Sequence, residues 1–235
     1  MGVDKALLHA VARDAQHDAL VDVLGGLAER WRTSVGGSQL TLLRAHTKDA
    51  MRGDGNGRPT RCFDATLELR TSGPPLEHDL FAGLASELDA VAWIDLCALQ
   101  LGAHRSFVAC DPTPVRFQYC MRRRHDFSHT AYLERYAAVH SRFGLETRGI
   151  EGYAQFHIDS EATAAAAEVA GVPTSRASSV SELHLASVEA FFAEGAHNAK
   201  LGATEDEDRF VDRAASVRWI SDAVLRLGSL PSASA

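Results

Sequence analysis

Alternating and helix-spaced apolar residues divide the first half of the chain into strands and helices. Short β-rich or alternating runs predict strands, and apolar residues about 3.6 positions apart predict helices. The turn signal Asp54-Gly55-Asn56-Gly57 is expected between the two middle strands. The expected strands cover residues 5–12, 39–48, 60–71 and 90–101, and the expected helices cover residues 16–33 and 76–89. The first half therefore follows the order β-α-β-β-α-β.

The second half shows the same order of patterns. Ser128 is an expected N-cap for its first helix, and Gly144 is expected to end that helix. The expected strands lie near residues 115–123, 150–158, 179–186 and 216–226, with helices near 128–142 and 187–195 and a short extra helix near 160–170. Each half thus predicts one β-α-β-β-α-β unit.

A match within the sequence supports two copies of this unit. Val91–Gly102 aligns with Val217–Gly228 without a gap, and the match covers the first four and the last four residues of each segment. His46 in the first half aligns with His157 in the second. The prolines of Asp111-Pro112-Thr113-Pro114 mark the boundary, because proline stops strand pairing and stiffens a link. We expect an N-terminal ferredoxin-like repeat over residues 1–110, a C-terminal repeat over residues 113–228 and a flexible tail over residues 229–235.

The repeat predicts the fold class. A four-stranded antiparallel sheet with both helices on one face leaves its other face uncovered, and a second such sheet can cover it. We therefore expect an α+β protein in which two tandem ferredoxin-like repeats form an intramolecular barrel of the dimeric α+β type.

Composition and charge narrow the classes of function. The chain is 46% apolar and 23% charged, as in soluble globular proteins, and no segment predicts a signal peptide or a membrane span. The net charge of -7 argues against nucleic acid as a partner, and Arg122-Arg123-Arg124 is too short a basic run to change that. The four cysteines lack metal-site or redox spacing and are expected to be buried and reduced. A cytoplasmic protein without a metal site is the resulting expectation.

The second half resembles the EthD family over about residues 114–225. Its pattern joins a basic strand end, a Ser-x-x-x-Tyr motif at Ser128 and Tyr132, and a helix that carries His140. The first half has no histidine at the place of His140, which suggests a mainly structural half. The resembling segments are Arg122–Arg124, Ser128–Tyr136, Gly149–Tyr153, Val180–Leu185 and Glu205–Asp212.

The resemblance implies a dimeric α+β barrel protein that acts on a small molecule. That superfamily contains cofactor-free isomerases, cyclases, dehydratases and oxygenases, together with some heme enzymes. EthD-like proteins often accompany degradation or polyketide pathways. A homodimer is a further expectation from the resemblance.

His140, Glu182 and His184 are the expected catalytic residues. A histidine can carry protons near neutral pH, although His140 could instead cap its helix end. Glu182 and His184 are two apart on a strand and so share a face, where a carboxylate can raise the basicity of an imidazole. A solvated strand face is the alternative for Glu182.

Further polar and aromatic residues are the expected substrate contacts. Alternation places them on common strand faces, and a pocket results if those faces coincide with that of Glu182 and His184. A tyrosine packed in the core with its hydroxyl satisfied is the alternative. These residues are Tyr119, Arg123, Tyr136, Tyr153, Gln155 and His157. His46 is expected to be structural, and His125 and His129 are expected to be solvated surface residues.

The leading hypothesis is a cofactor-independent enzyme. It would act by proton transfer as a lyase, dehydratase or isomerase on an aromatic or apolar small molecule. One alternative is a non-catalytic small-molecule-binding accessory protein. The other is a heme-binding barrel enzyme with His140 or His184 as the axial ligand.

Overall fold

The computed structural model describes residues 2–110 and 112–230. Asp111 in the predicted boundary and most of the predicted tail lie outside the described residues. Within the described ranges no helix is both long and apolar enough to cross a bilayer.

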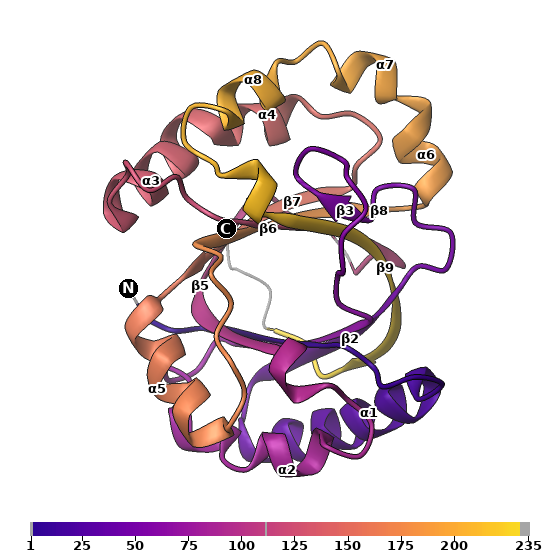
Figure 1. Cartoon of the computed structure of the whole chain (residues 1–235), viewed down its shortest axis with the longest axis vertical. Helices are drawn as coiled ribbons and strands as arrows, with labels where there is room; N and C mark the ends of the chain where they lie inside the picture. Colours follow the sequence, from indigo (N-terminus) through magenta and orange to yellow (C-terminus); the bar gives the residue numbers. More distant parts are fainter. Residues whose placement is uncertain (1, 111, 231–235) are drawn as a thin grey trace.

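Eight antiparallel strands form a closed barrel (Figure 1). Their order around the barrel is β2-β4-β1-β5-β7-β8-β6-β9, and β9 pairs with β2 to close it, while the short β3 also pairs with β9. The strands are β1 (Lys5–Ala10), β2 (Ser38–Ala45), β3 (Gly53–Asp54), β4 (Ala65–Thr71), β5 (Ala98–Val108), β6 (Val115–Met121), β7 (Gly152–Ile158), β8 (Ser179–Leu185) and β9 (Val217–Leu227). The predicted α+β barrel is therefore confirmed.

Two long strands join the halves of the barrel. β5 pairs with β1 up to Gly102 and then continues along β7. β9 pairs first with β6 and then, from Ser221 onward, with β2. Each half thus ends in a strand that extends across to the other half, which leaves no open sheet edge in the eight-stranded ring.

Helices cover the outer face of the barrel in two layers (Figure 1). The layer over the first half contains α1 (His17–Ser34), the 3₁₀-helix η1 (His78–Phe81), α2 (Leu84–Leu88) and α5 (Ser160–Ala170). The layer over the second half contains α3 (His129–Arg135), a π-helix (Tyr136–His140), α4 (Ser141–Glu146), α6 (Val188–Ala193), α7 (Gly195–Asn198) and α8 (Ala203–Glu207). Two further 3₁₀-helices, η2 (Ile94–Leu96) and η4 (Arg213–Ala215), precede β5 and β9.

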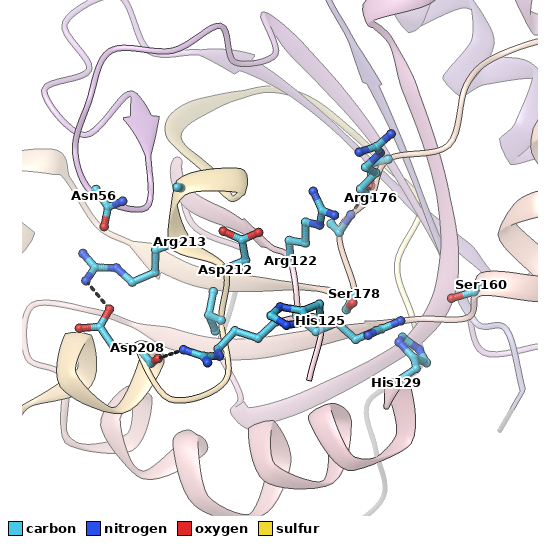
Figure 2. Close-up of a pocket in the computed structure, with 16 residues that line it drawn as sticks. Asn56, Arg122, His125, His129, Ser160, Arg176, Ser178, Asp208, Asp212 and Arg213 are labelled. Atoms are coloured by element: carbon cyan, nitrogen blue, oxygen red, sulfur yellow. Dashed lines mark hydrogen bonds and ion pairs between the residues drawn. The ribbon is translucent and has the colours of Figure 1, made fainter. Parts of the chain in front are cut away.

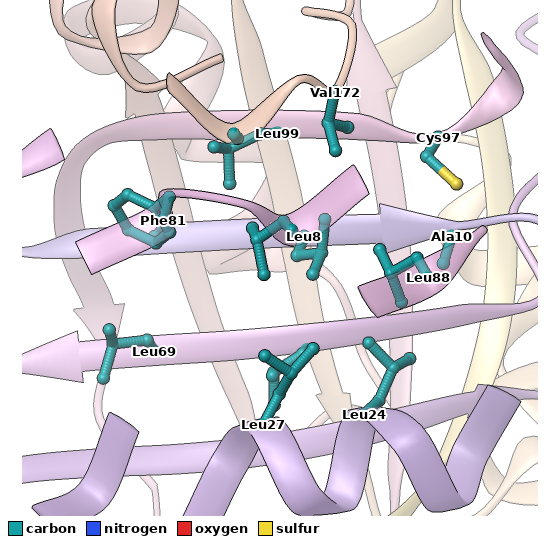
Figure 3. Close-up of a cluster of buried hydrophobic side chains, with 14 of the residues drawn as sticks. Leu8, Ala10, Leu24, Leu27, Leu69, Phe81, Leu88, Cys97, Leu99 and Val172 are labelled. Carbon is teal, nitrogen blue, oxygen red and sulfur yellow. The ribbon is translucent and has the colours of Figure 1, made fainter. Parts of the chain in front are cut away.

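The core of the first half follows the predicted alternation. Leu8 on β1 and Leu69 on β4 point away from the barrel interior and pack with Leu24 and Leu27 of α1 (Figure 3). Ala166 of α5 joins the same core, although this helix belongs to the second half of the sequence. The predicted extra helix therefore covers the other half of the barrel.

Several predicted elements need correction. The strand expected at residues 90–101 begins only at Ala98, and Trp93 precedes it with 39% of its surface exposed, whereas Trp219 lies in β9 and is buried. The match of these two tryptophans therefore does not hold in the structure. The helix expected at residues 76–89 divides into η1 and α2, with Gly83 between them at a φ of 78°.

The turn at Asp54–Gly57 forms, since the Gly57 amide donates to the Asp54 carbonyl oxygen, but it follows the short β3. It does not join the middle strands directly, because β4 begins only at Ala65. The residues between instead bring Cys62 into the barrel core.

Candidate functional site

The expected site residues of the second half lie on two opposite faces of the barrel wall. Tyr153 on β7 points outward under the helices and joins the apolar core there, and Gln155 bonds to the backbone of the π-helix. Glu182 on β8 points into the barrel, where it meets Lys5. The two faces do not coincide, so the single pocket expected from these strands does not form.

Glu182 belongs to a buried network of charges inside the barrel. Lys5 Nζ lies 2.5 Å from Glu182 Oε2 and 2.6 Å from Glu68 Oε2. Arg116 Nη1 lies 3.2 Å from Glu68 Oε2 and 3.3 Å from Glu182 Oε1. Burial opposes ionisation of Glu68, but Lys5 and Arg116 hold its pKa well below the ordinary value. Two residues from each half therefore neutralise one another, which favours a structural role for Glu182.

His184 also faces the barrel interior. Burial, reinforced by the charge of Arg116, lowers the pKa of His184 to about 2. Its Nδ1 is buried without a hydrogen-bond partner in the described part of the chain. A ring with so low a pKa is a poor base at neutral pH, and the geometry does not favour the expected pairing of Glu182 with His184.

His140 lies under the second helix layer, between two carboxylates. Its Nδ1 is 3.0 Å from Asp206 Oδ2, and its Nε2 is 3.9 Å from Glu207 Oε1. The predicted helix is interrupted by a π-helix at Tyr136–His140, whose wider turn carries this ring, and α8 supplies both carboxylates. Asp206 also pairs with Arg135, so it is held on two sides. We call His140, Asp206 and Glu207 the buried triad.

Burial sets the protonation of the triad. It lowers the pKa of His140, and the hydrogen bond that the His140 ring donates to Asp206 opposes that change. It raises the pKa of Glu207 to about 7, against the opposing charge of Arg213. A carboxyl group with a pKa near neutrality can take up and release a proton under ordinary conditions. The triad is therefore suited to proton transfer.

Four of the expected substrate contacts form a cluster that reaches the triad through Tyr136. Tyr136 packs against His140 and His157 with ring centroids 5.8 Å and 5.7 Å away. Gln155 Nε2 donates to Tyr153 Oη over 2.7 Å, and Gln155 Oε1 lies 2.9 Å from His157 Nε2. Burial raises the pKa of Tyr153 to about 12, so its phenol stays protonated at neutral pH. The structure thus brings Tyr136, Tyr153, Gln155 and His157 together, with Tyr136 next to His140.

Tyr119 lies at the other side of the triad. Its hydroxyl is buried and has no hydrogen-bond partner among the described residues. Burial raises the pKa of Tyr119, and Glu207 acts in the same direction. The Tyr119 hydroxyl comes so close to Gly55 that a Cβ there would lie 2.2 Å from it. Tyr119 therefore retains an unused donor near Glu207.

An open pocket of about 890 Å³ lies at the end of the barrel (Figure 2), and Arg213 in its wall pairs with Glu207 of the triad. Five arginines line it against two aspartates, which gives a net of three positive charges (5 − 2) apart from the histidines. The arginines are Arg122, Arg123, Arg124, Arg176 and Arg213, and the aspartates are Asp208 and Asp212. We call this cavity the arginine pocket.

The arginines of this pocket differ in how they are paired. Arg213 pairs with Asp208 at 3.0 Å and with Glu207 of the triad at 3.5 Å. Arg123 Nη1 donates to the Phe127 carbonyl oxygen, so its guanidinium is partly used by the protein. The guanidinium groups of Arg122 and Arg176 make no ion pair or hydrogen bond to the residues that the structure describes. Figure 2 shows Arg122 between Asp212 and Arg176.

Sequence reasoning missed most of this pocket. Of its arginines only Arg123 was an expected substrate contact, and His129, expected on the surface, lines the pocket with a partly buried ring. The run Arg122–Arg124 was visible in the sequence. Arg176 and Arg213 join it only because the loops before β8 and β9 reach the same end of the barrel.

Comparison with solved structures supports the fold as a whole. An anthrone oxidase-like protein aligns with a TM-score of 0.59 at 11% identity over 100% of this chain and 97% of that chain. A chlorite dismutase-like protein aligns at 0.54 and 10% identity over 96% of both chains. A dye-decolorizing peroxidase from Bacteroides thetaiotaomicron aligns at 0.51 and 8% identity over 95% and 94%. The chain has the dimeric α+β barrel fold.

Comparisons at the level of sequence give no family. No family model matches the chain, and no curated protein matches it significantly. The resemblance to the EthD family therefore stays a prediction.

The residues around the two candidate axial histidines do not fit a heme. The rings of Phe143 and Phe210 lie 5.1 Å and 5.3 Å from the His140 ring, with Tyr136 close by. The Nε2 of His140 faces Glu207, and these rings pack around it where a flat macrocycle would have to lie. His184 lies beside the charge network inside the barrel. Neither histidine therefore has surroundings that fit a heme.

Proposed function

We propose that this protein is an enzyme of small-molecule metabolism that transfers protons in its second half. The observation that carries the proposal is the position of Glu207. Its carboxylate lies 3.9 Å from His140 on one side and 3.5 Å from Arg213 of the arginine pocket on the other. A buried proton-transfer group thus lies one side chain behind an open pocket.

The roles follow from the chemistry of each group. Glu207 takes a proton from a substrate atom that reaches past the Arg213 side chain, which separates it from the pocket. His140 receives this proton or hydrogen-bonds the carboxyl group, while Asp206 holds the ring through Nδ1. Arg122 and Arg176 hold a negatively charged substrate and stabilise charge that develops on it. Tyr119 can donate a hydrogen bond to the same charge. No group other than these side chains is needed for the proton to move.

The reaction type follows from proton removal as the first step. A carbanion or enolate formed in this way can be reprotonated elsewhere, can expel a leaving group, or can react with O₂ as the oxidant. These outcomes correspond to an isomerase, a dehydratase or lyase, and an oxidase. The names of an anthrone oxidase-like and a monooxygenase-like structural neighbour make O₂ a reagent to include in the test.

Other expectations from the sequence remain proposals beside this one. They are two tandem ferredoxin-like repeats with a boundary near residue 111, an EthD-like second half, a cytoplasmic location and a homodimer. The polar lining of the arginine pocket changes one expectation, because it favours an anionic substrate over an apolar one.

A conversion assay tests the proposed function. Wild type, Glu207→Gln and His140→Ala are incubated with aromatic and aliphatic keto acids and phenolic acids, with and without O₂, and products are followed by mass spectrometry. Glu205→Gln is the matched control, since this exposed carboxylate lies on the same helix. We expect conversion by wild type and the control and a loss of at least about 100-fold in the two variants. Binding without conversion by wild type would instead support the accessory-protein alternative.

A further inference from the structure

A second pocket adjoins the arginine pocket. It has a volume of about 330 Å³, and both cavities are lined by His129 and Ser160. Apolar side chains contribute much of its wall, namely Val3, Ala103 and Leu133. Figure 2 shows His129 and Ser160 at the same end of the arginine pocket. One basic and one largely apolar cavity thus meet at shared residues.

His129 has a defined tautomer at this junction. Its Nε2 lies 2.8 Å from the carbonyl oxygen of Ile158. Because a carbonyl oxygen only accepts, Nε2 carries the hydrogen, and Nδ1 of the neutral ring holds a lone pair. The ring can therefore accept a hydrogen bond from a ligand that passes from one pocket to the other.

Charge distinguishes the two pockets. The first is net positive, and its Arg122 and Arg176 are not neutralised by contacts within the described residues. The second contains Asp159 and Glu161 at its rim, and the Asp159 carboxylate accepts the backbone amides of Glu161 and Ala162 at the start of α5. An anionic group is favoured in the first cavity and disfavoured in the second.

We propose that the two pockets together bind an amphipathic organic anion. Its headgroup, a carboxylate or an equivalent acidic group, pairs with Arg122 and Arg176. Its apolar arm crosses His129 and packs on Leu133 and Val3. This inference rests on the proposed function and names the substrate class of the same site. A cavity of this combined kind suits a ligand of ordinary metabolite size.

Direct binding of simple probes tests the inference without requiring turnover. Calorimetry measures the affinity of Glu207→Gln for butyrate, hexanoate and octanoate and for the neutral alcohol octanol. We expect the dissociation constant to fall about three- to fourfold for each added methylene group, because each buries apolar surface. We expect octanol to bind at least about 10-fold more weakly than octanoate, since it lacks the charge that the arginines pair.

Variants assign the two ends of the ligand. Arg122→Gln should weaken the binding of octanoate by at least about 10-fold, with little effect on the binding of octanol. Leu133→Asp should remove the dependence on chain length, whereas Leu145→Asp, at a leucine of the same helical layer that is 53% exposed, should not. Circular dichroism and a thermal melt establish that each variant is folded.

The outcomes separate the two proposals. Affinity that does not change with chain length, or equal binding of octanol and octanoate, overturns the amphipathic anion even if the enzyme turns over another compound. Chain-length-dependent binding of the anions with no conversion of any compound by wild type leaves this inference standing and removes the proposed function.

Discussion

At the scale of single residues, burial decides which ionisable groups are available for chemistry. Glu182 and Glu207 are both buried carboxylates, yet Glu182 is neutralised by Lys5 and Arg116, whereas Glu207 keeps a pKa of about 7. The sequence could indicate that Glu182 and His184 share a face, and they do. It could not indicate which side of the wall that face lies on, because strand alternation alone does not distinguish inside from outside in a barrel.

Glu207→Gln should stabilise the protein at alkaline pH. Burial raises the pKa of Glu207 from its ordinary 4.5 to about 7, so the folded protein holds this proton more tightly than the unfolded chain. Wild type therefore loses stability as the pH rises from 4.5 to 7, and the neutral amide avoids that loss. We expect the free energy of unfolding to increase by about 3 kcal/mol at pH 8 and not at pH 4. Urea denaturation at both pH values measures the free energy of unfolding. An equal change at pH 4 and pH 8 would contradict the raised pKa of Glu207.

Glu182→Gln should destabilise the protein. The change leaves the charges of Lys5 and Arg116 with one carboxylate between them inside the barrel. Removing one partner from a buried ion pair costs about 3 kcal/mol or more in free energy of unfolding. Denaturant unfolding of this variant beside Glu134→Gln, at an exposed glutamate, provides the comparison. A loss no larger than that of Glu134→Gln would show that the network contributes little.

At the scale of elements, the strands with clear alternation were predictable and the irregular connections were not. The expected boundaries of β6, β7, β8 and β9 agree with the structure to within two residues. The segment Val91–Cys97 was mistaken for strand because it is rich in apolar residues, but it forms a turn from which only some of them, such as Val91 and Ala92, pack in the core. The arginine pocket also depends on connections, since Arg176 and Arg213 precede β8 and β9 by a few residues. Periodicity carries no information on where such loops meet.

Gly102→Ala should disrupt the junction of the two halves. Gly102 lies where β5 passes from β1 to β7, and an added Cβ would lie 2.0 Å from the backbone oxygen of His157. Backbone cannot move aside as a side chain can, so we expect a loss of about 2 to 3 kcal/mol in free energy of unfolding. Gly195→Ala is the matched control, with no atom within 4 Å of the added Cβ. Thermal melts of both variants test this prediction. Similar melting temperatures would contradict the close contact between Gly102 and the backbone of His157.

At the scale of the whole molecule, the barrel separates its packed interior from the proposed site. The interior holds the charge network and histidines that stay neutral, whereas the buried triad lies on the outer face of the second half and the arginine pocket lies at the end of the barrel. The prediction of a barrel was correct because it depends on the number and order of strands. The position of the proposed site depends on which helix layer leaves an opening, and hydrophobic periodicity does not indicate that.

The stability of the whole protein should fall as the pH is lowered. Burial lowers the pKa values of His9, His104, His157 and His184 to about 3, 2, 4 and 2, from an ordinary 6.5. Below pH 6.5 these histidines become protonated in the unfolded chain but stay neutral in the folded protein. Each ring therefore lowers the free energy of unfolding by at most about 1.4 kcal/mol per pH unit. Glu207 opposes this with a single proton. Urea denaturation from pH 7 to pH 4.5 should show a steep decline, and a flat profile would contradict neutral buried rings.

Deuterium uptake by a bound substrate tests the central claim most directly. In D₂O, an enzyme that removes a proton from carbon exchanges that hydrogen for deuterium, whatever product follows. Anionic compounds that bind the protein are incubated with wild type, Glu207→Gln and Glu205→Gln, and mass spectrometry records the label. The account predicts uptake with wild type and Glu205→Gln, and a rate at least about 100-fold lower with Glu207→Gln. Uptake that is unchanged in Glu207→Gln, or absent with wild type for every anion that binds, would contradict proton transfer at this site.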